Sequence, residues 1–467
     1  MRKRLLLMAA VGLLLAAGGL AAALFLVVER RPSGALETKV TGVTLVPSKP
    51  KPTKPKPKPR PKPKRKPAAP VVAADKPCWP NFGGNPERSL ARNDINLGRP
   101  TKPIWARGLH GYIEYAPSYC DGRLYVNTYR GETFAIDALT GRILWSRKGA
   151  GPKPSTPAIA GDRLIVTSTG GTVTALARSD GRTIWQLRIA AKVESSPVVV
   201  DGTVYFGATD GRLFAVAVRT GRIRWAYNTG GRINASPSVY GRRICITTYA
   251  GSIFCLDRRN GQKLWDRYIK RDIVRYESFY ASPSTDGRRL FTISRSGKVV
   301  VLRASNGEVL WTRDLNTTGY STPAVSRGRI FVGDFNGMLH CYSAATGREL
   351  WRRYVGGRIL GPALVVGNLV FFSTLEQKTY AVRFSDGRLL WHVGIGKYAP
   401  GIATDRHYFF SLNGILIAYR GRYSPPEQKL TPRERGAAAR GASAGRRGSP
   451  TSTRPRARRT TRAGPGR

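Results

Sequence analysis

Cysteine and histidine are the residue types that most often bind metals or act as nucleophiles, and this chain has five cysteines and four histidines. No Cys/His pair shows the spacing of a metal motif, and no cysteine is paired with a histidine that would activate a thiolate. The histidines are scattered: His110, His340, His392 and His407. The sequence therefore predicts no catalytic residue, no metal site and no cofactor.

Charged and tyrosine side chains recur in the segments between a tryptophan and the proline that follows it. Ammonium and guanidinium groups attract anions, and tyrosine rings offer flat contact area with a polar end. A cluster of them would suit an anionic polymer, a glycan or an acidic protein surface, while the alternative is ordinary solvated loops on a basic protein. The candidate binding residues are Glu114, Lys192, Glu194, Arg232, Lys270, Arg271, Tyr280, Tyr320, Arg358 and Lys397.

The elements that must position these residues follow from a repeat. Eight of the nine tryptophans are 40 residues apart, except for one spacing of 46: Trp105, Trp145, Trp185, Trp225, Trp265, Trp311, Trp351 and Trp391. Each period holds four short runs of β-branched and aromatic residues separated by glycine turns, as in 116–119, 123–126, 133–137 and 142–145. Helical periodicity is absent, so the repeat predicts four-stranded antiparallel sheets.

Counting the strands predicts a closed ring. The last unit lacks its fourth strand, and an unpaired fourth strand ending in Trp105 precedes the first unit. Joining the two completes an eighth blade and removes the exposed sheet edges. We therefore expect an all-β, eight-bladed β-propeller over residues 73–424, in which an N-terminal strand completes the last blade.

Large and small residues are expected to face each other across the central hairpin of each blade, as Tyr125 faces Ala135 and Tyr408 faces Ala418. In the fourth unit Cys245 faces Cys255, so a cross-strand disulfide is geometrically feasible in an oxidising compartment. Cys78 and Cys120 are a second candidate pair. Cys341 is expected to be a small core residue.

The two ends of the chain differ from the repeat region. Residues 5–28 form an uncharged run of 24 residues behind Arg2, Lys3 and Arg4. Its length predicts one transmembrane helix acting as a signal anchor, with 1–4 as a short cytoplasmic end; a cleaved signal peptide is the alternative. Residues 29–72 predict a disordered, Lys/Pro-rich extended spacer, and residues 425–467 a disordered, Arg-rich basic tail. The expected location is the cell membrane, single-pass, with the bulk extracytoplasmic.

Charge is the other strong compositional signal. The net charge is +50, and residues 79–420 keep +25 of it. Such a balance attracts anionic cell-wall or membrane polymers. Nucleic-acid binding by the tail has weaker support because no aromatic residues lie between its arginines.

The segment Ala135-Ile-Asp-Ala-Leu-Thr-Gly-Arg-Ile-Leu-Trp145 resembles the tryptophan-docking motif of PQQ-like (pyrroloquinoline quinone repeat) β-propellers. The segment Trp79-Pro-Asn-Phe-Gly-Gly-Asn-Pro-Glu-Arg-Ser89 is similar to the entry segment of that family. The resemblance covers about residues 79–420 and implies that all eight periodic tryptophans are structural docking residues.

The family contains two kinds of protein that bear on function. Its quinoprotein dehydrogenases hold the quinone and Ca²⁺, with an adjacent Cys-Cys pair; here no two cysteines are adjacent, and no calcium ligand set can be carried over. Its BamB-type members are non-enzymatic scaffolds with lean blades, which this chain resembles more closely. The prediction is a non-catalytic envelope-binding or scaffold propeller with a protein partner as one option; a PQQ/Ca-dependent oxidoreductase and a polyanion-binding or nucleic-acid-binding protein are the alternatives.

Overall fold

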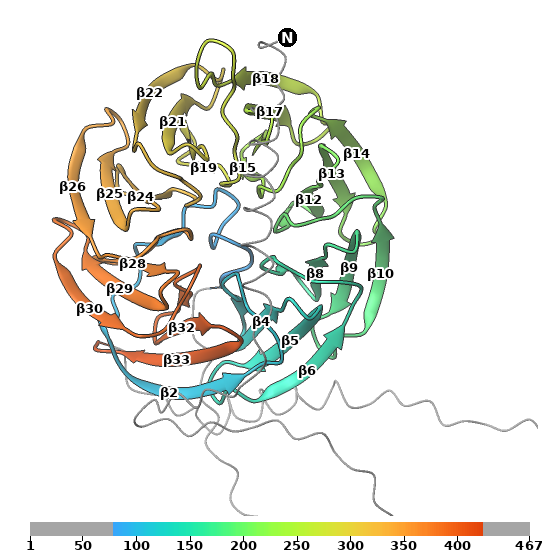
Figure 1. Cartoon of the computed structure of the whole chain (residues 1–467). Helices are drawn as coiled ribbons and strands as arrows, with labels where there is room; N and C mark the ends of the chain where they lie inside the picture. Colours follow the sequence, from blue (N-terminus) through green and yellow to red (C-terminus); the bar gives the residue numbers. More distant parts are fainter. Residues whose placement is uncertain (1–77, 424–467) are drawn as a thin grey trace, which may run out of the picture. The chain divides into compact units, whose positions relative to one another are not determined.

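The computed structural model describes residues 78–423, which form eight sheets around a central axis (Figure 1). The prediction of an all-β, eight-bladed propeller with four-stranded antiparallel blades is confirmed. The predicted cytoplasmic end (1–4), membrane anchor (5–28), spacer (29–72) and tail (425–467) lie outside the described residues. Between residues 78 and 423, no helix is long and apolar enough to span a bilayer.

Each blade begins at the axis and ends at the rim. The innermost strands are β3 (Ser118–Cys120), β7 (Ala158–Ala160), β11 (Val198–Val200), β15 (Ser238–Tyr240), β19 (Ser284–Thr285), β23 (Ala324–Ser326), β27 (Leu364–Val366) and β31 (Ile402–Ala403). The second strands are β4 (Arg123–Asn127), β8 (Arg163–Thr167), β12 (Thr203–Gly207), β16 (Arg243–Thr247), β20 (Arg289–Ile293), β24 (Arg329–Gly333), β28 (Leu369–Thr374) and β32 (His407–Leu412).

The remaining strands complete the blades toward the rim. The third strands are β5 (Glu132–Asp137), β9 (Thr172–Ala177), β13 (Arg212–Ala217), β17 (Ser252–Asp257), β21 (Lys298–Arg303), β25 (Met338–Ser343), β29 (Lys378–Arg383) and β33 (Ile415–Gly421). The rim strands are β6 (Ile143–Lys148), β10 (Thr183–Arg188), β14 (Ile223–Asn228), β18 (Lys263–Tyr268), β22 (Val309–Asp314), β26 (Glu349–Tyr354), β30 (Leu389–Val393) and β2 (Pro100–Gly108).

The core lies between the blades. The second and third strands are buried along almost their whole length, as in β8 and β9, because each blade packs against a neighbour on both faces. The rim strand β10 has no buried residue, and half of its residues are exposed. Every strand pairs with another strand between residues 91 and 421, so this part of the chain supplies all the partners of its own sheets and forms a self-contained unit.

In seven of the eight blades, the rim-strand tryptophan donates a hydrogen bond to the next blade. The indole Nε1 of Trp185, for example, donates a 2.8 Å hydrogen bond to the carbonyl of Val218, 33 residues further on. The same bond joins Trp145 to Arg178 and Trp351 to Phe384. The glycine four residues before each following tryptophan lies flat on the indole, since a Cβ at Gly221 would be 2.8 Å from the Trp185 ring. Tryptophan and glycine therefore recur together because only a residue without a side chain can pack this closely on the indole ring.

A second link runs around the axis through the residue before the early proline. The backbone N–H of Thr156 donates to the hydroxyl of Ser196 at 3.0 Å, and that of Ser196 donates to Ser236 at 2.9 Å. The relay continues from Ser236 to Ser282 and from Ser282 to Thr322. Hydroxyl side chains at this position thus bond successive blades to each other near the axis.

The segment before the first blade fills the middle of the ring. Residues 79–92, which we call the axial segment, appear in blue at the centre of Figure 1. Their carbonyls accept hydrogen bonds from the inner strands of several blades, including those from Ile159, Val239 and Val325. The short strand β1 (Ala91–Arg92) pairs in parallel with β27. The axial segment therefore ties the inner strands together.

Arg88 holds the axial segment at its centre. Its side chain is fully buried and donates three hydrogen bonds, to the carbonyls of Pro237, Phe82 and Ser196 at 2.6, 2.8 and 2.9 Å. Burial lowers the pKa of this guanidinium to about 9. Carbonyl oxygens thus accept three of the five N–H donors of this buried cation.

The predicted cross-strand pairs hold in six blades, including Tyr125 opposite Ala135 and Phe331 opposite Cys341. The eighth blade corrects the prediction, because Ala418 lies opposite Phe409 and not Tyr408. There the turn between Leu412 and Ile415 has two residues, against the five-residue connection between Asn127 and Thr133. A change of turn length shifts the register by one residue. The rim strand of this blade is β2, paired with β33.

Candidate binding face

One face of the ring collects two kinds of connection. Strands alternate in direction, so the entry into each inner strand and the turn between the second and third strands lie at the same end of a blade. Hydrogen bonds show this directly: the N–H of Tyr129 donates to the carbonyl of Tyr112, and that of Tyr249 to Arg232, both at 2.9 Å. We call this side the entry face; its entry loops are 109–117, 149–157, 189–197, 229–237, 269–283, 315–323, 355–363 and 394–401.

A cluster of tyrosines and arginines occupies the entry face of the fourth to sixth blades. The rings of Tyr249 and Tyr280 meet edge to face at 6.2 Å, and those of Tyr280 and Tyr320 at 5.5 Å. The guanidinium of Arg295 lies 5.7 Å from both Tyr249 and Tyr320, and its Nε donates to the Tyr320 hydroxyl at 3.2 Å. Arg232 lies 5.2 Å from the Tyr249 ring. We call these five residues the tyrosine–arginine cluster.

A second group lies on the first and eighth blades. The ring of Tyr112 contacts those of Tyr129 and Tyr398 at 5.5 and 5.9 Å. Lys397 places its ammonium 5.2 Å from the Tyr112 ring. The hydroxyl of Tyr129 donates a 2.6 Å hydrogen bond to Glu114. The pattern of cation on tyrosine thus occurs twice on the same face.

Two carboxylates link these groups electrostatically. Burial raises the pKa of Glu114 to about 7; the Tyr129 hydrogen bond opposes this rise, and the charge of Glu194 adds to it. Glu194 accepts a short hydrogen bond from the amide of Asn234 and lies 3.9 Å from Arg232. Burial, followed by Glu114 and Glu194, raises the pKa of Tyr280. Residues from distant blades therefore share one electrostatic environment.

The other four predicted binding residues lie outside these two groups. Arg358 bonds to Glu376 at 2.9 Å and lies over the Phe335 ring. Lys192 is exposed. Lys270 and Arg271 belong to the long loop between β18 and β19, and Arg271 lines an open groove of about 870 Å³ together with Arg295 and Tyr320. The structure thus places Arg232, Tyr280 and Tyr320 in the tyrosine–arginine cluster, with Glu194 beside Arg232, and it places Glu114 and Lys397 in the second group.

The list of ten candidates left out five members of these groups. Tyr112 and Tyr398 lie within the segments between tryptophan and proline that were searched. Tyr129, Tyr249 and Arg295 lie in the turn between second and third strands, which the search did not cover. The alternation of strand direction was the signal that could have found them, since it places both connections at one end of the blade.

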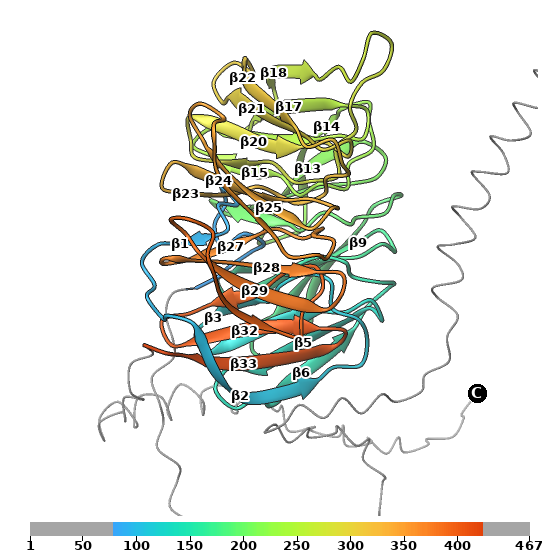
Figure 2. The same ribbon diagram turned by 60° about the vertical axis from the view of Figure 1, so that its left-hand side comes forward.

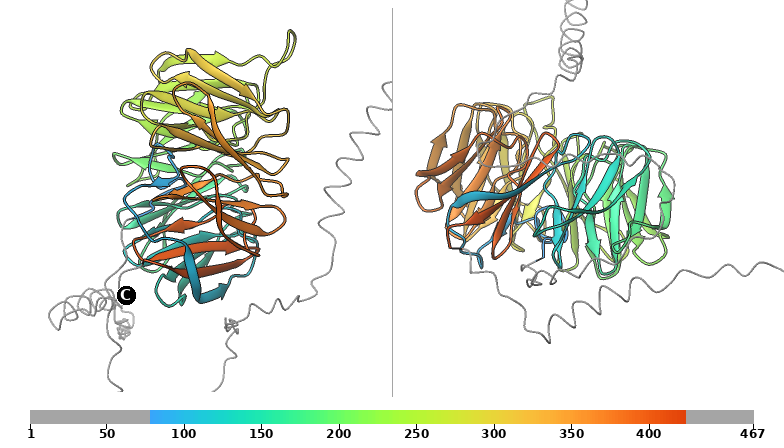
Figure 3. Two further views of the ribbon diagram at one scale, coloured as in Figure 1. Left: turned by 90° about the vertical axis from the view of Figure 1, so that its left-hand side faces the viewer. Right: turned by 90° about the horizontal axis from the view of Figure 1, so that it is seen from below.

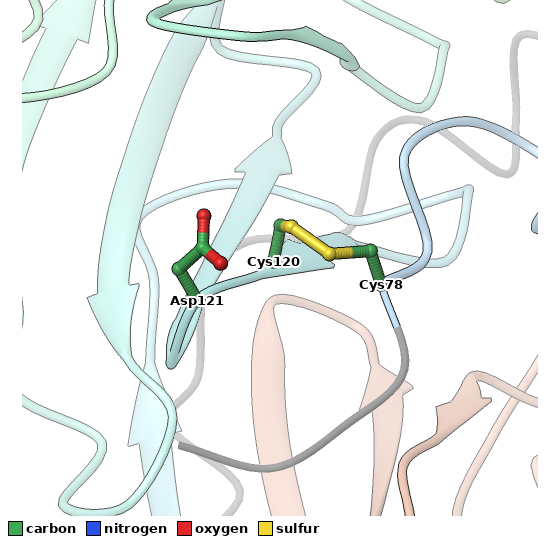
Figure 4. Close-up of side chains that lie close together, drawn as sticks. All are labelled: Cys78, Cys120 and Asp121. Atoms are coloured by element: carbon green, nitrogen blue, oxygen red, sulfur yellow. A yellow bond between two sulfur atoms is a disulfide. The ribbon is translucent and has the colours of Figure 1, made fainter. Parts of the chain in front are cut away.

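The first blade carries a group of two cysteines and one aspartate that resembles a metal-binding site. Cys78, Cys120 and Asp121 lie within ligand distance of one another (Figure 4). The two sulfurs, however, form a disulfide, and Asp121 pairs with Arg178 at 3.1 Å. A disulfide sulfur is not the thiolate that metals bind. Among the residues that the structure describes, this is the single group of three such ligands, and its chemistry does not suit a metal.

The other cysteines complete the inventory. Cys245 and Cys255, opposite each other on β16 and β17, are joined by a second disulfide. Cys341 is buried and carries a free thiol. Burial raises the pKa of this thiol to about 12, which disfavours the thiolate that nucleophilic chemistry requires.

Comparison with known proteins supports the β-propeller fold. The family model described as outer membrane protein assembly factor BamB matches residues 96–313, 274–337 and 295–407. The crystal structure of BamB from Moraxella catarrhalis is similar at 20% identity and a TM-score of 0.50, over 70% of this chain and 96% of that one. A comparison with curated protein sequences gives no match.

Two further solved structures share the fold. The quinohemoprotein alcohol dehydrogenase of Comamonas testosteroni is 14% identical with a TM-score of 0.62, over 76% of this chain and 82% of that one. The computationally designed protein Ika8 is 14% identical with a TM-score of 0.60, over 67% of this chain and 98% of its own. An enzyme and a designed protein on one fold show that function depends on the site.

Proposed function

The chain belongs to the family described as outer membrane protein assembly factor BamB, and on that premise we propose that it is a non-catalytic binding and scaffold protein of the cell envelope. Its partner is a protein that docks on the entry face. The proposal includes a single membrane anchor at residues 5–28, a spacer at 29–72, the propeller at 73–424 and a basic tail at 425–467. The bulk of the chain is extracytoplasmic.

The tyrosine–arginine cluster is the observation that carries this proposal. Tyrosine and arginine are enriched where proteins bind each other tightly, since both combine a large flat surface with polar ends. Arg295 is held by two rings and one hydroxyl, which fixes its guanidinium before a partner arrives. A guanidinium that is already positioned recognises a carboxylate in the partner with little loss of side-chain entropy.

Two disulfides support the extracytoplasmic location. Disulfides such as Cys78–Cys120 and Cys245–Cys255 persist in oxidising compartments and are rare in the reducing cytosol. The apolar run at 5–28, which is long enough to cross a bilayer, provides the corresponding anchor.

The proposal is tested by capture of envelope proteins on the purified propeller, residues 73–424. Replacing Arg232 and Arg295 by alanine should abolish capture of a specific protein. The matched control is Arg182→Ala with Arg222→Ala, which removes the same charge from exposed turns at the opposite end of the blades. Equal capture by both double variants, or no specific protein on the unaltered propeller, would contradict the proposal.

A second arm separates the propeller from its basic flanks. Co-sedimentation with purified anionic envelope polymer compares residues 73–424 with residues 29–467 at low and high salt. We expect the longer chain to bind in a salt-sensitive manner, because counterion release governs contacts made by flexible basic segments. Salt-resistant polymer binding by residues 73–424 would instead make the polymer the ligand of the entry face.

The quinoprotein alternative requires a site for quinone and calcium. No two described cysteines are adjacent, and both disulfides join residues at least ten positions apart. On the axis, Arg88 is fully buried and Phe82 packs edge to face on Tyr115 at 5.5 Å. The residues present do not fit the cofactor pair, which supports a non-catalytic role. Stoichiometric quinone binding with Ca²⁺-dependent dye reduction would overturn it.

A further inference from the structure

The loop between β18 and β19 departs from the repeat. The repeat unit after Trp265 is six residues longer than the others. Within this longer loop, residues 270–276 form a small hairpin, which we call the finger. Lys270 and Tyr276 form an antiparallel β-bridge, and the N–H of Arg271 donates to the carbonyl of Arg275 at 2.8 Å. Asp272 closes the turn, because its carboxylate accepts the backbone N–H groups of Val274 and Arg275 at 3.1 and 2.8 Å. The finger therefore has a defined fold.

The tip of the finger is apolar and exposed. Ile273 is 94% exposed and Val274 is 85% exposed, whereas the next most exposed large hydrophobic residue of the described chain, Tyr354, reaches 65%. Figure 2 shows this yellow-green loop after β18 standing out beyond the neighbouring loops, and the left-hand view of Figure 3 shows the same projection. Two adjacent aliphatic residues at the end of a projecting hairpin make the most water-exposed apolar point of the described chain.

Basic residues and tyrosines surround the apolar tip of the finger. Lys270, Arg271 and Arg275 stand next to the apolar pair, and one acid, Asp272, pairs with Arg275 at 2.8 Å. The finger thus carries a net positive charge. Beneath it, the half-exposed rings of Tyr268 and Tyr276 meet edge to face at 5.5 Å. At a lipid–water interface, aliphatic side chains favour the hydrocarbon, whereas lysine, arginine and tyrosine side chains favour the headgroup region.

We propose that the finger inserts its Ile273–Val274 tip into the surface of an anionic phospholipid bilayer. A fluid lipid surface accepts a convex two-residue tip without a complementary pocket, whereas a stable protein interface needs about 800 Å² from each partner. The basic collar then lies among anionic headgroups, where each cation adds attraction. This contact goes beyond the proposed scaffold function, because it is a second membrane contact made by the propeller itself.

Sedimentation with sucrose-loaded vesicles tests the proposal on residues 73–424, which contain all strands of the ring. One set of vesicles is phosphatidylcholine alone, and the other contains phosphatidylglycerol as well. We expect partitioning onto the anionic vesicles only, and a loss of about tenfold or more for Ile273→Ser with Val274→Ser, because two buried aliphatic side chains are removed. Arg271→Gln with Arg275→Gln should lower the partitioning and its sensitivity to salt.

The matched control is Ile223→Ser with Leu389→Ser, which removes two half-exposed aliphatic residues from the rim strands β14 and β30. This control should sediment like the unaltered propeller. If the tip variant sediments normally, or if the unaltered propeller sediments with neither set of vesicles, the proposal is wrong. If the unaltered propeller sediments with neither set of vesicles, the exposure of the tip would instead be explained by a pocket that binds it in a partner protein.

Discussion

The indole N–H of Trp225 donates a 3.1 Å hydrogen bond to the carbonyl of Arg258 in the following blade. The face of the same indole is covered by Gly261, three residues beyond that carbonyl, where a Cβ would lie 2.8 Å from the ring. One side chain thus joins two sheets by a directional bond and by close packing. The same bond and contact recur around the ring. The stability that is lost when one of them is removed therefore reports how strongly neighbouring blades stabilise each other.

Replacing Trp225 by alanine should lower the free energy of unfolding by about 3 kcal/mol, since a large, partly buried aromatic side chain and its hydrogen bond are both lost. Trp225→Phe should cost less because most of the packing remains. Urea denaturation followed by circular dichroism measures both. Tyr354→Ala, at an exposed aromatic residue, is the control; a Trp225→Ala variant as stable as this control would contradict the docking role.

The close approach of Gly261 to Trp225 predicts a steric penalty that can be separated from backbone strain. Gly261 and Gly230 both have positive φ, +76° and +72°, but a Cβ at Gly230 would meet nothing within 4 Å. Gly230→Ala should therefore cost about 1 kcal/mol through its backbone alone, and Gly261→Ala about 1–3 kcal/mol more. Equal losses of unfolding free energy for Gly230→Ala and Gly261→Ala would show that the Trp225 indole moves aside without an energetic cost.

The raised pKa of Glu114 predicts a pH-dependent stability. Its carboxyl group ionises near pH 4.5 in the unfolded chain and at about 7 in the fold, so the folded protein holds more protons between these values. The free energy of unfolding should therefore fall as pH rises from about 4.5 to 7, by at most about 3 kcal/mol, and then stay level. Glu114→Gln cannot ionise and should lack this decline.

Denaturation of both proteins at pH 4.5 and pH 8 provides the comparison for Glu114. Below pH 4.5 the two should differ little, because Glu114 is protonated in both states of the natural chain. Above pH 7 the glutamine variant should be the more stable one. Parallel pH profiles for the two proteins would show that Glu114 ionises in the fold as readily as in water.

The thiol inventory can be counted directly by alkylation. In denaturant without a reductant, iodoacetamide should add a single group to the chain, at Cys341, because the other cysteines form two disulfides. After reduction, all five cysteines should be labelled. Mass spectrometry of the protein isolated from the cell envelope counts the added groups before and after reduction. Five additions without a reductant would contradict the disulfides and weaken the extracytoplasmic assignment.

The architecture could be predicted from the amino-acid sequence because propeller blades are built from local signals. The 40-residue period of tryptophans, the glycine turns and the alternating strands lie within single units, where hydrogen-bonded hairpins form between close neighbours in the chain. The cross-strand pairs followed from the same logic. They shifted only in the eighth blade, where a two-residue turn at Asn413–Gly414 changes the register.

Which side chains meet on the entry face depends on how the blades are arranged in the folded ring. Tyr249, Arg295 and Tyr320 come from the fourth, fifth and sixth blades, and their proximity depends on how the ring closes and on which end of each blade they occupy. The axial segment is a similar case: Arg88 bonds to carbonyls more than a hundred residues away, and no local pattern indicates this. Short-range order follows from neighbouring residues, whereas a binding face requires long-range packing to bring separate turns together.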